Sequence, residues 1–125
     1  MRISSVALLI LALGAACSST HLALPTDPAW QATGCRGVGL DGILRSSPSD
    51  QRLFWLEDRT TGERVDLIWP AGYYARDDFG LEVVDDSGTF VGKAGDLVTG
   101  ACVVSAQGNT GPPYHVWAGE VHAAQ

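Results

Sequence analysis

The chain has little positive charge, and this shortage excludes one broad class of partner. Its 125 residues include eight lysines and arginines against fourteen aspartates and glutamates, which gives a formal net charge of −6 at pH 7. Proteins that bind nucleic acid present clustered basic side chains to the phosphate backbone. The sequence shows no basic cluster of that kind. We therefore expect no nucleic-acid partner, and the acidity favours solubility.

The sequence also lacks a hydrophobic run long enough for a transmembrane helix, which needs about 20 apolar residues. The apolar run near the N-terminus, Val6–Leu13, is much shorter than that. Arg2 precedes this run, and the small residues Gly14–Ala16 follow it. A positive start, a short apolar stretch and small residues are the features of an export signal. Residues 1–16 are thus predicted to be a signal peptide that is removed.

The residues after the apolar run predict a lipid anchor. The stretch "LGAAC" resembles a bacterial lipobox, in which a signal peptidase cuts before a cysteine that carries the lipid; here that residue is Cys17. The usual pattern has leucine three residues before the cysteine, whereas this chain has Gly14 there and Leu13 one step further out. The resemblance implies attachment to the extracytoplasmic side of a bacterial membrane. Ordinary secretion after cleavage at the small residues is the alternative.

Cysteine is scarce, and the odd count has to be explained in an exported chain. The three cysteines are Cys17, Cys35 and Cys102. If Cys17 carries lipid, Cys35 and Cys102 remain as one pair in an oxidising compartment, which favours a disulfide. Closing a loop of that length would stabilise the fold by roughly 4 kcal/mol in the chain-entropy model. Two free buried thiols are the alternative.

Helical periodicity is hard to find after the leader. Residues 17–34 are rich in serine, threonine, proline and alanine, and they are predicted to be a tether, in which Trp30 is unusual. Residues 35–125 alternate short apolar runs with turn residues, which predicts a small antiparallel barrel of about 5–7 strands, OB-like or related. A short helix is possible near Tyr73–Asp78. The expected strands are Val38–Leu44, Arg52–Asp58, Glu63–Trp69, Leu81–Val84, Thr89–Gly92, Asp96–Val104 and Tyr114–Val121.

A glycine pattern in the first expected strand resembles a dinucleotide-binding loop. Gly37, Gly39 and Gly42 spell G-x-G-x-x-G. That loop has to follow a strand and open a helix. The preceding "ATGCR" is a poor strand, and the following "ILRSSPSD" is not helical. We therefore interpret the glycines as part of a bent strand, and we expect neither a nucleotide nor another cofactor.

The sequence Asp86–Thr89, "DSGT", resembles the catalytic motif of aspartic proteases, which pair two carboxylates to activate water. The surrounding "VVDDSGTFV" is also typical of a β-hairpin, with Gly88 supplying the positive φ of the turn. The hairpin is the favoured interpretation. A small carboxylate-dependent hydrolase remains the alternative function. It would use Asp85 or Asp86 together with Asp66, Asp77 or Asp78.

The remaining residue types give little support to a catalytic or metal site. His115 and His122 are seven residues apart, which places them on opposite faces of a strand, and His21 lies in the predicted tether. With Glu120 they match no familiar ligand pattern. No G-x-S-x-G sequence is present. We expect no metal ion and no nucleophilic catalytic residue.

The segment Ile68–Cys102 resembles a group of small, uncharacterised bacterial secreted proteins and lipoproteins, and the resemblance covers about Gly37 to Cys102. The group shares Trp-Pro, Gly-Tyr-x-Ala-Arg, Leu-Glu-Val-x-Asp-x-x-Gly and Gly-Asp-x-Val-x-Gly. The matching residues are Trp69, Pro70, Gly72, Tyr73, Ala75, Arg76, Gly88, Gly95, Asp96, Val98 and Gly100. In this chain Asp77-Asp78 stands where similar chains often continue Arg-Phe. The resemblance implies a fold and export, and no activity.

Pro70 ends a strand in this segment, because proline cannot donate to the ladder. Aromatic and cationic side chains follow it, in a predicted loop where binding residues concentrate. The candidate binding loop consists of Trp69, Tyr73, Tyr74 and Arg76. In the alternative, the aromatic side chains cap the barrel and Arg76 pairs with a nearby aspartate. The predicted function is a non-enzymatic binding or structural module of the cell envelope, with a protein or a glycan as its partner.

Overall fold

The structure is a computed structural model that describes residues 20–28, 39–105, 113–116 and 121–123. All the regular elements in these ranges are β-strands, which confirms the predicted all-β class. The strands are β1 (Thr20–Ala23), β2 (Thr26–Asp27), β3 (Gly39–Ser46), β4 (Phe54–Asp58), β5 (Arg64–Val65), β6 (Leu67–Pro70), β7 (Tyr74–Asp77), β8 (Leu81–Val84), β9 (Phe90–Lys93), β10 (Leu97–Ser105), β11 (Tyr114–His115) and β12 (Val121–His122). Within the same ranges, no helix has the length and hydropathy that crossing a bilayer requires.

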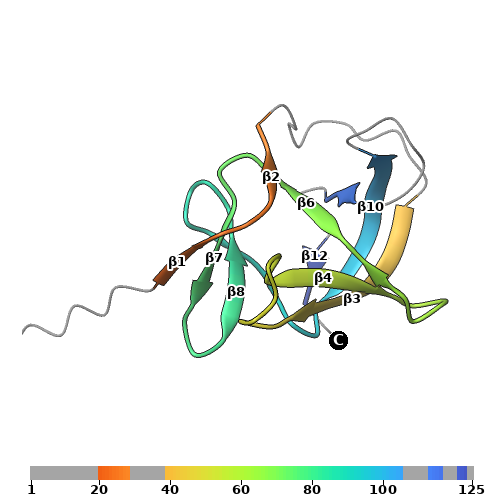
Figure 1. Ribbon diagram of the computed structural model, residues 1–125, viewed down its shortest axis with the longest axis horizontal. Coiled ribbons are helices and arrows are strands. Elements are labelled where there is room, and N and C mark those ends of the chain that lie inside the picture. Colours follow the sequence, from red (N-terminus) through yellow and green to blue (C-terminus); the bar gives the residue numbers. More distant parts are fainter. Residues whose placement is uncertain (1–19, 29–38, 106–112, 117–120, 124–125) are drawn as a thin grey trace, which may run out of the picture.

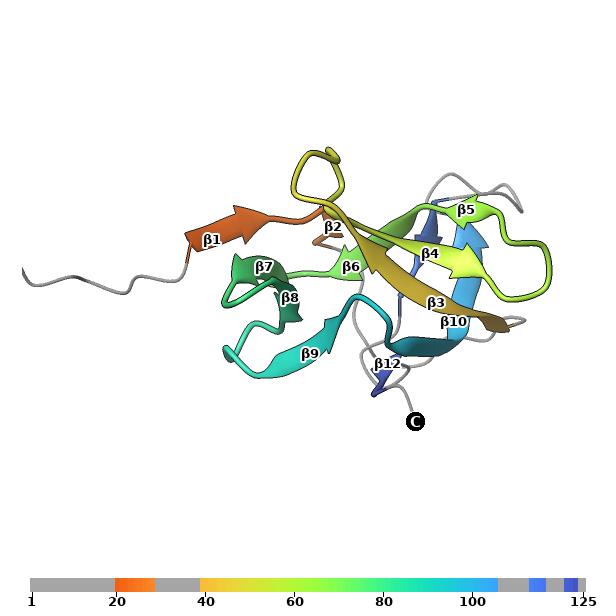
Figure 2. The same cartoon turned by 90° about the horizontal axis from the view of Figure 1, so that it is seen from below.

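The strands form two sheets (Figure 1). The small sheet has the order β1-β7-β8-β9, and the large sheet has the order β2-β6-β11-β10-β3-β4-β5, with β12 beside β10. Figure 2 shows the small sheet at the left of the molecule and β3, β4, β5 and β10 at the right. The pairings among the described strands close no ring, so what they confirm is the all-β class.

Glycine is required in β3 by the close approach of β4. Gly39 and Gly42 both lie in this strand, as expected from the absence of a helix after them, whereas Gly37 lies outside the described residues. A Cβ atom on Gly42 would come within 2.5 Å of the carbonyl oxygen of Glu57 and of the Leu56 side chain. A glycine in a strand commonly marks such a close backbone contact. Strand packing thus explains the glycine at position 42 of the G-x-G-x-x-G pattern.

The possible helix at Tyr73–Asp78 is wrong, because Tyr74–Asp77 form β7. This strand pairs with β1 on one side and with β8 on the other. Ala75 is completely buried, while its neighbours along the strand are partly exposed. Residues such as alanine and arginine have good helix propensity, but tertiary pairing routinely overrides so weak a preference.

The described part of the predicted tether is integrated into the sheets. β1 pairs antiparallel with β7, and β2 pairs parallel with β6. Leu24 joins the hydrophobic core, and Asp27 lies 3.1 Å from Nε2 of the buried His115. The folded unit therefore includes Thr20–Asp27. Its N-terminal boundary lies before Cys35, the position expected from the sequence. Trp30 lies outside the described residues.

The core lies mainly between strands of the large sheet. Trp69 is its largest side chain and is 0% exposed, in edge-to-face contact with Phe54 at 6.5 Å between ring centroids. The other large, fully buried side chains are Leu44, Leu56, Leu67, Val83, Val84, Val98 and Val116. Burying side chains of this size contributes about 1.5–3 kcal/mol each. This core holds the loops of the molecule at defined positions.

Candidate functional site

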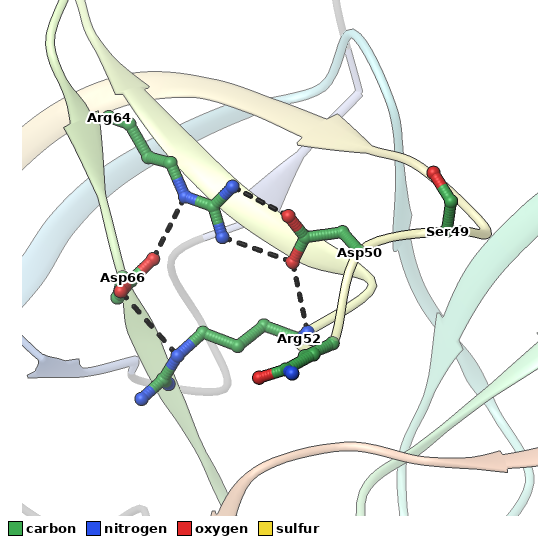
Figure 3. Close-up of a pocket in the computed structure, with 6 residues that line it drawn as sticks. Ser49, Asp50, Arg52, Arg64 and Asp66 are labelled. Carbon is green, nitrogen blue, oxygen red and sulfur yellow. Dashed lines mark hydrogen bonds and ion pairs between the residues drawn. The ribbon is translucent and has the colours of Figure 1, made fainter.

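A polar hollow of about 340 Å³ lies beside the large sheet, and its lining carries four charged side chains (Figure 3). We call it the arginine hollow. The connection from β3 to β4 supplies one wall, and β5 with the residue after it supplies the other. The lining residues are Ser49, Asp50, Gln51, Arg52, Arg64 and Asp66.

The β3–β4 connection is held in shape by its own hydrogen bonds. The backbone N–H of Ser47 donates to the carbonyl of Leu53 at 3.0 Å, and the N–H of Leu53 donates to the carbonyl of Asp50 at 3.1 Å. The Asp50 carboxylate accepts the N–H of Arg52 at 2.9 Å, as aspartate does in turns. Leu53 has a φ of +62° and its side chain is buried in the core. The loop is therefore fixed at its base, and Asp50 and Arg52 are presented in a defined orientation.

Arg64 is the centre of the hollow. Its two terminal nitrogens donate to both oxygens of Asp50, at 2.6 and 3.0 Å, and its Nε donates to Asp66 at 3.0 Å. Its guanidinium carbon also lies 4.6 Å from the centre of the Trp55 ring. Two-pronged pairs of this kind are the strongest arginine–carboxylate contacts, and the ring adds a cation–π attraction. Arg64 is thus held by three neighbours at once.

These contacts shift the pKa values of Asp50 and Arg64. Hydrogen bonds from the Arg64 side chain, followed by the backbone N–H of Arg52, lower the pKa of Asp50 below its ordinary value of 3.8. The pKa of Arg64 is raised, mainly by its hydrogen bonds to Asp50 and next by its hydrogen bond to Asp66. Asp50 is therefore ionised at neutral pH and is a poor proton donor. The arrangement suits recognition better than acid–base chemistry.

Arg52 is the arginine that remains open to a ligand. Its Nη1 donates to the backbone carbonyl of Leu67 at 3.0 Å, and its Nε lies 3.5 Å from Asp66. Figure 3 shows its guanidinium beyond Asp66 and directed away from Asp50. Guanidinium has five N–H donors, so these contacts leave donors for an incoming acceptor. Two arginines and two aspartates cancel in charge, which suits a neutral polar group better than a strongly charged one.

The structure divides the predicted binding loop between two strands. Trp69 lies in β6 and is fully buried, and its ring stacks on that of the half-buried Tyr73 at 6.3 Å between centroids. Tyr74 and Arg76 lie in β7, where Tyr74 stacks on His21 of β1 and Arg76 pairs with Glu82. The pKa of the Tyr73 hydroxyl is raised, mainly by burial and to a smaller extent by the negative charges of Asp85 and Asp86 at the β8–β9 turn.

The reason for this division is that Pro70 ends β6 and the chain turns at once into another strand. The N–H of Tyr73 donates to the carbonyl of Pro70 at 3.2 Å, and Gly72 has a φ of +85°. Only the short turn between β6 and β7 is left as a loop, and Ala71 and Gly72 are its exposed residues. The four aromatic and cationic side chains therefore present no common exposed surface.

The "DSGT" segment forms the turn of the β8–β9 hairpin. The carboxylate of Asp85 accepts the backbone N–H groups of Ser87 and Thr89, each at 2.9 Å, and Gly88 has a φ of +81°. These bonds are those of an aspartate that caps a turn, which confirms the hairpin interpretation. Two further aspartates considered for hydrolysis are also engaged: Asp66 with Arg64, and Asp77 with the N–H of Gly80 at 3.1 Å.

Several other predicted residues cannot be placed as a site. Cys17 and Cys35 lie outside the described residues, and only the backbone position of Cys102, in β10, is described. His21, His115 and His122 lie in β1, β11 and β12, three separate strands. In the ranges that the structure describes, no cluster of three histidine, cysteine or acidic residues is arranged to hold a metal ion.

Sequence reasoning missed the arginine hollow, although part of the signal was present. Asp50 and Arg52 are two residues apart, and so are Arg64 and Asp66. In extended chain this spacing places side chains on one face. The pairing of β3 with β4 and of β4 with β5, which joins the two pairs, cannot be read from the spacing.

Comparisons of this chain with protein-family models, with curated protein sequences and with solved structures find no match.

Proposed function

We propose that this chain is a lipid-anchored, non-enzymatic module of the bacterial cell envelope, which binds a partner protein through the arginine hollow. The observation that carries the proposal is the preformed ion-pair network around Arg64, which fixes Arg52 as a donor without using all of its N–H groups. A fixed guanidinium loses little side-chain freedom on binding, so such a site gains affinity from preorganisation.

The anchor part of the proposal is supported by the lipobox-like stretch before Cys17 and by the position of β1, the first described strand. β1 starts at Thr20, three residues after Cys17. A lipid on Cys17 would hold the domain against the membrane by the small sheet. Arg64 belongs to β5, which lies on the other side of the molecule from β1 (Figure 2). The arginine hollow would then be accessible to a partner in the envelope.

The anchor is tested by fractionating cells that express Cys17→Ser and, as the matched control, Ser18→Ala. We expect the wild-type protein and Ser18→Ala in the membrane fraction and Cys17→Ser in the soluble fraction or as uncut precursor. Release of the wild-type protein into the soluble fraction would contradict the anchor and favour ordinary secretion.

The binding site is tested by replacing Gln51, which lines the hollow, with a photo-crosslinking amino acid in cells. The matched position is Thr60, an exposed residue after β4. We expect a discrete protein adduct from position 51 and none from position 60. The adduct should be lost in Arg52→Ala and retained in Arg59→Ala, which removes an exposed arginine outside the hollow. Equal adducts from both positions, or an adduct insensitive to Arg52→Ala, would contradict the proposal.

A further inference from the structure

Two large apolar side chains stay exposed among the residues that the structure describes, and both lie on the small sheet. Phe79, in the turn between β7 and β8, is fully exposed, and Phe90 of β9 is 46% exposed. Both line the same hollow of about 310 Å³, together with Leu81 and Lys93. Exposed aromatic side chains that gather at one place mark contact surfaces more often than those scattered singly.

The backbone at Phe79 is unfavourable for this side chain. Phe79 has a φ of +57°, in the left-handed region that bulky residues rarely adopt. The turn around it is closed by the N–H of Asp78, which donates to the carbonyl of Gly80 at 3.0 Å, and by the Asp77 carboxylate, which accepts the N–H of Gly80. Glycine or asparagine at position 79 would satisfy the same turn at lower cost. An aromatic ring held there in solvent contributes nothing to the packing of the fold.

The turn lies beside the point where the anchor would enter the fold. In the register of the small sheet, Thr20 of β1 is paired with Asp77 of β7, two residues before Phe79. Two residues, Ser18 and Ser19, lie between Cys17 and Thr20, so the two Cα atoms can be at most about 11 Å apart. A lipid on Cys17 would therefore bring the β7–β8 turn to within a short distance of the membrane surface. Figure 1 shows β1 at the side of the molecule that carries β7 and β8.

We propose that the β7–β8 turn is a membrane-contact point, in which the Phe79 side chain inserts between lipids next to the anchor. This inference rests on the proposed lipidation of Cys17. One ring gives only marginal binding, so it serves to orient a domain that the acyl chains already hold. The result is a fixed orientation, with the small sheet against the bilayer and the arginine hollow away from it.

The negative charges at the β7–β8 turn favour contact with a bilayer whose surface carries little negative charge. Asp77 and Asp78 are exposed, and neither forms a salt bridge with another described residue, although the charge of Asp78 adds to that of Glu82 in raising the pKa of Arg76. Anionic lipids would repel these two carboxylates, whereas a zwitterionic surface would not. The turn therefore fits a membrane surface of low net charge.

The test replaces Phe79 with a photo-crosslinking phenylalanine analogue, and uses Thr60 as the matched position in the turn after β4. Each protein is purified from the membrane fraction and reconstituted in phosphatidylcholine vesicles, and its acylation is verified by intact mass. On irradiation we expect lipid adducts from position 79 in roughly fivefold or greater excess over position 60, since an apolar side chain partitions from water into the bilayer. The analogue at position 90 should give an intermediate yield.

The charge selection is tested in the same assay by replacing half of the phosphatidylcholine with phosphatidylglycerol. We expect the lipid-adduct yield from position 79 to fall, and high salt to restore it because salt screens the repulsion. An unchanged yield would overturn the preference for a surface of low charge.

Two results would overturn the inference while leaving the anchor intact. An acylated protein that gives equal lipid adducts from positions 79 and 60 has no fixed orientation. An acylated protein that gives only protein–protein adducts from position 79 in the vesicles uses the turn to contact a second copy of the chain. A protein without acylation, seen in the intact mass, removes the anchor and the inference together, so the two failures are distinguished. Coincident thermal unfolding of the variants and the wild-type protein shows that the fold is retained.

Discussion

The two sheets differ in what they bury and in what they expose. The large sheet supplies most of the heavy core side chains, among them Trp69, Phe54 and Leu56, and its surface carries paired charges. The strands of the small sheet have four residues each, and this sheet carries the two exposed phenylalanines. The large sheet thus provides stability and a preorganised polar surface. The small sheet, which contains β1, contributes fewer large side chains to the core and exposes an apolar surface instead.

Among substitutions that test the difference between the sheets, Gly42→Ala in the large sheet is expected to change the free energy of unfolding most. The new Cβ atom would come within 2.5 Å of the backbone oxygen of Glu57, so β3 and β4 would have to separate. We expect a loss of about 2–3 kcal/mol in the free energy of unfolding, as for other overpacked sites, measured by urea denaturation.

Gly62→Ala is the matched control for Gly42→Ala. Gly62 has a φ of +71° and open space around it, so the substitution should cost only about 1 kcal/mol, from backbone strain. If Gly42→Ala cost no more than Gly62→Ala, the close approach of β4 would not be what requires glycine in β3.

The next effect is expected from His21→Ala in the small sheet. The imidazole of His21 stacks on the Tyr74 ring at 3.9 Å between centroids and joins β1 to β7. Losing this stacking should cost about 0.5–1 kcal/mol and should increase hydrogen exchange in β7. His122→Ala, at an exposed position of β12, is the control. Unchanged exchange in β7 would indicate that β1 contributes nothing to the sheet.

A smaller effect of opposite sign is expected from Phe79→Gly. Removing a bulky side chain from a positive φ should stabilise the protein by about 0.5 kcal/mol, after the entropy cost of glycine is subtracted. Phe90→Gly, which introduces glycine within β9, should instead destabilise. Thermal unfolding of both variants measures the difference. A loss of stability in Phe79→Gly would mean that the ring supports the fold and is not there for contact with another surface.

The smallest effect is expected from Asp50→Asn, and it depends on pH. The pKa of Asp50 is lowered in the folded protein, mainly by Arg64, so its carboxylate stabilises the fold above its ordinary value of 3.8. That contribution is lost as the pH falls from about this value through the lower pKa of the folded state. Urea unfolding from pH 7 to pH 2.5 should show a difference between the wild type and Asp50→Asn that shrinks in acid. A difference independent of pH would contradict the ion pair with Arg64.

Much of the strand pattern could be predicted from the sequence, because it depends on local alternation and turn residues. The expected strand Leu81–Val84 has the bounds of β8, and the expected Thr89–Gly92 and Asp96–Val104 each lie within a residue of β9 and β10. The turn at Asp85 was also predicted, since its hydrogen bonds join residues close in the chain.

The features that were missed depend on residues distant in sequence. Thr20 pairs with Asp77 and Asp27 approaches His115, so neither β1 nor β2 has a local signature in its Ser/Thr/Pro-rich surroundings. Trp69 was placed in a candidate binding loop, with capping of the barrel as the alternative, and its burial could not be decided locally because it depends on Phe54 and on the packing of the large sheet. The arginine hollow was missed for the same reason, because Arg64 meets Asp50 only after β3, β4 and β5 have paired.

The proposed orientation of the molecule depends on a lipid at Cys17 that holds the domain by its small sheet. The intact mass of the protein from the membrane fraction should be measured with and without reduction. We expect a chain that begins at an acylated Cys17 and gains two protons on reduction, as a Cys35–Cys102 disulfide requires. A mature chain of unmodified mass would contradict the anchor, and with it the orientation of the two sheets at the membrane.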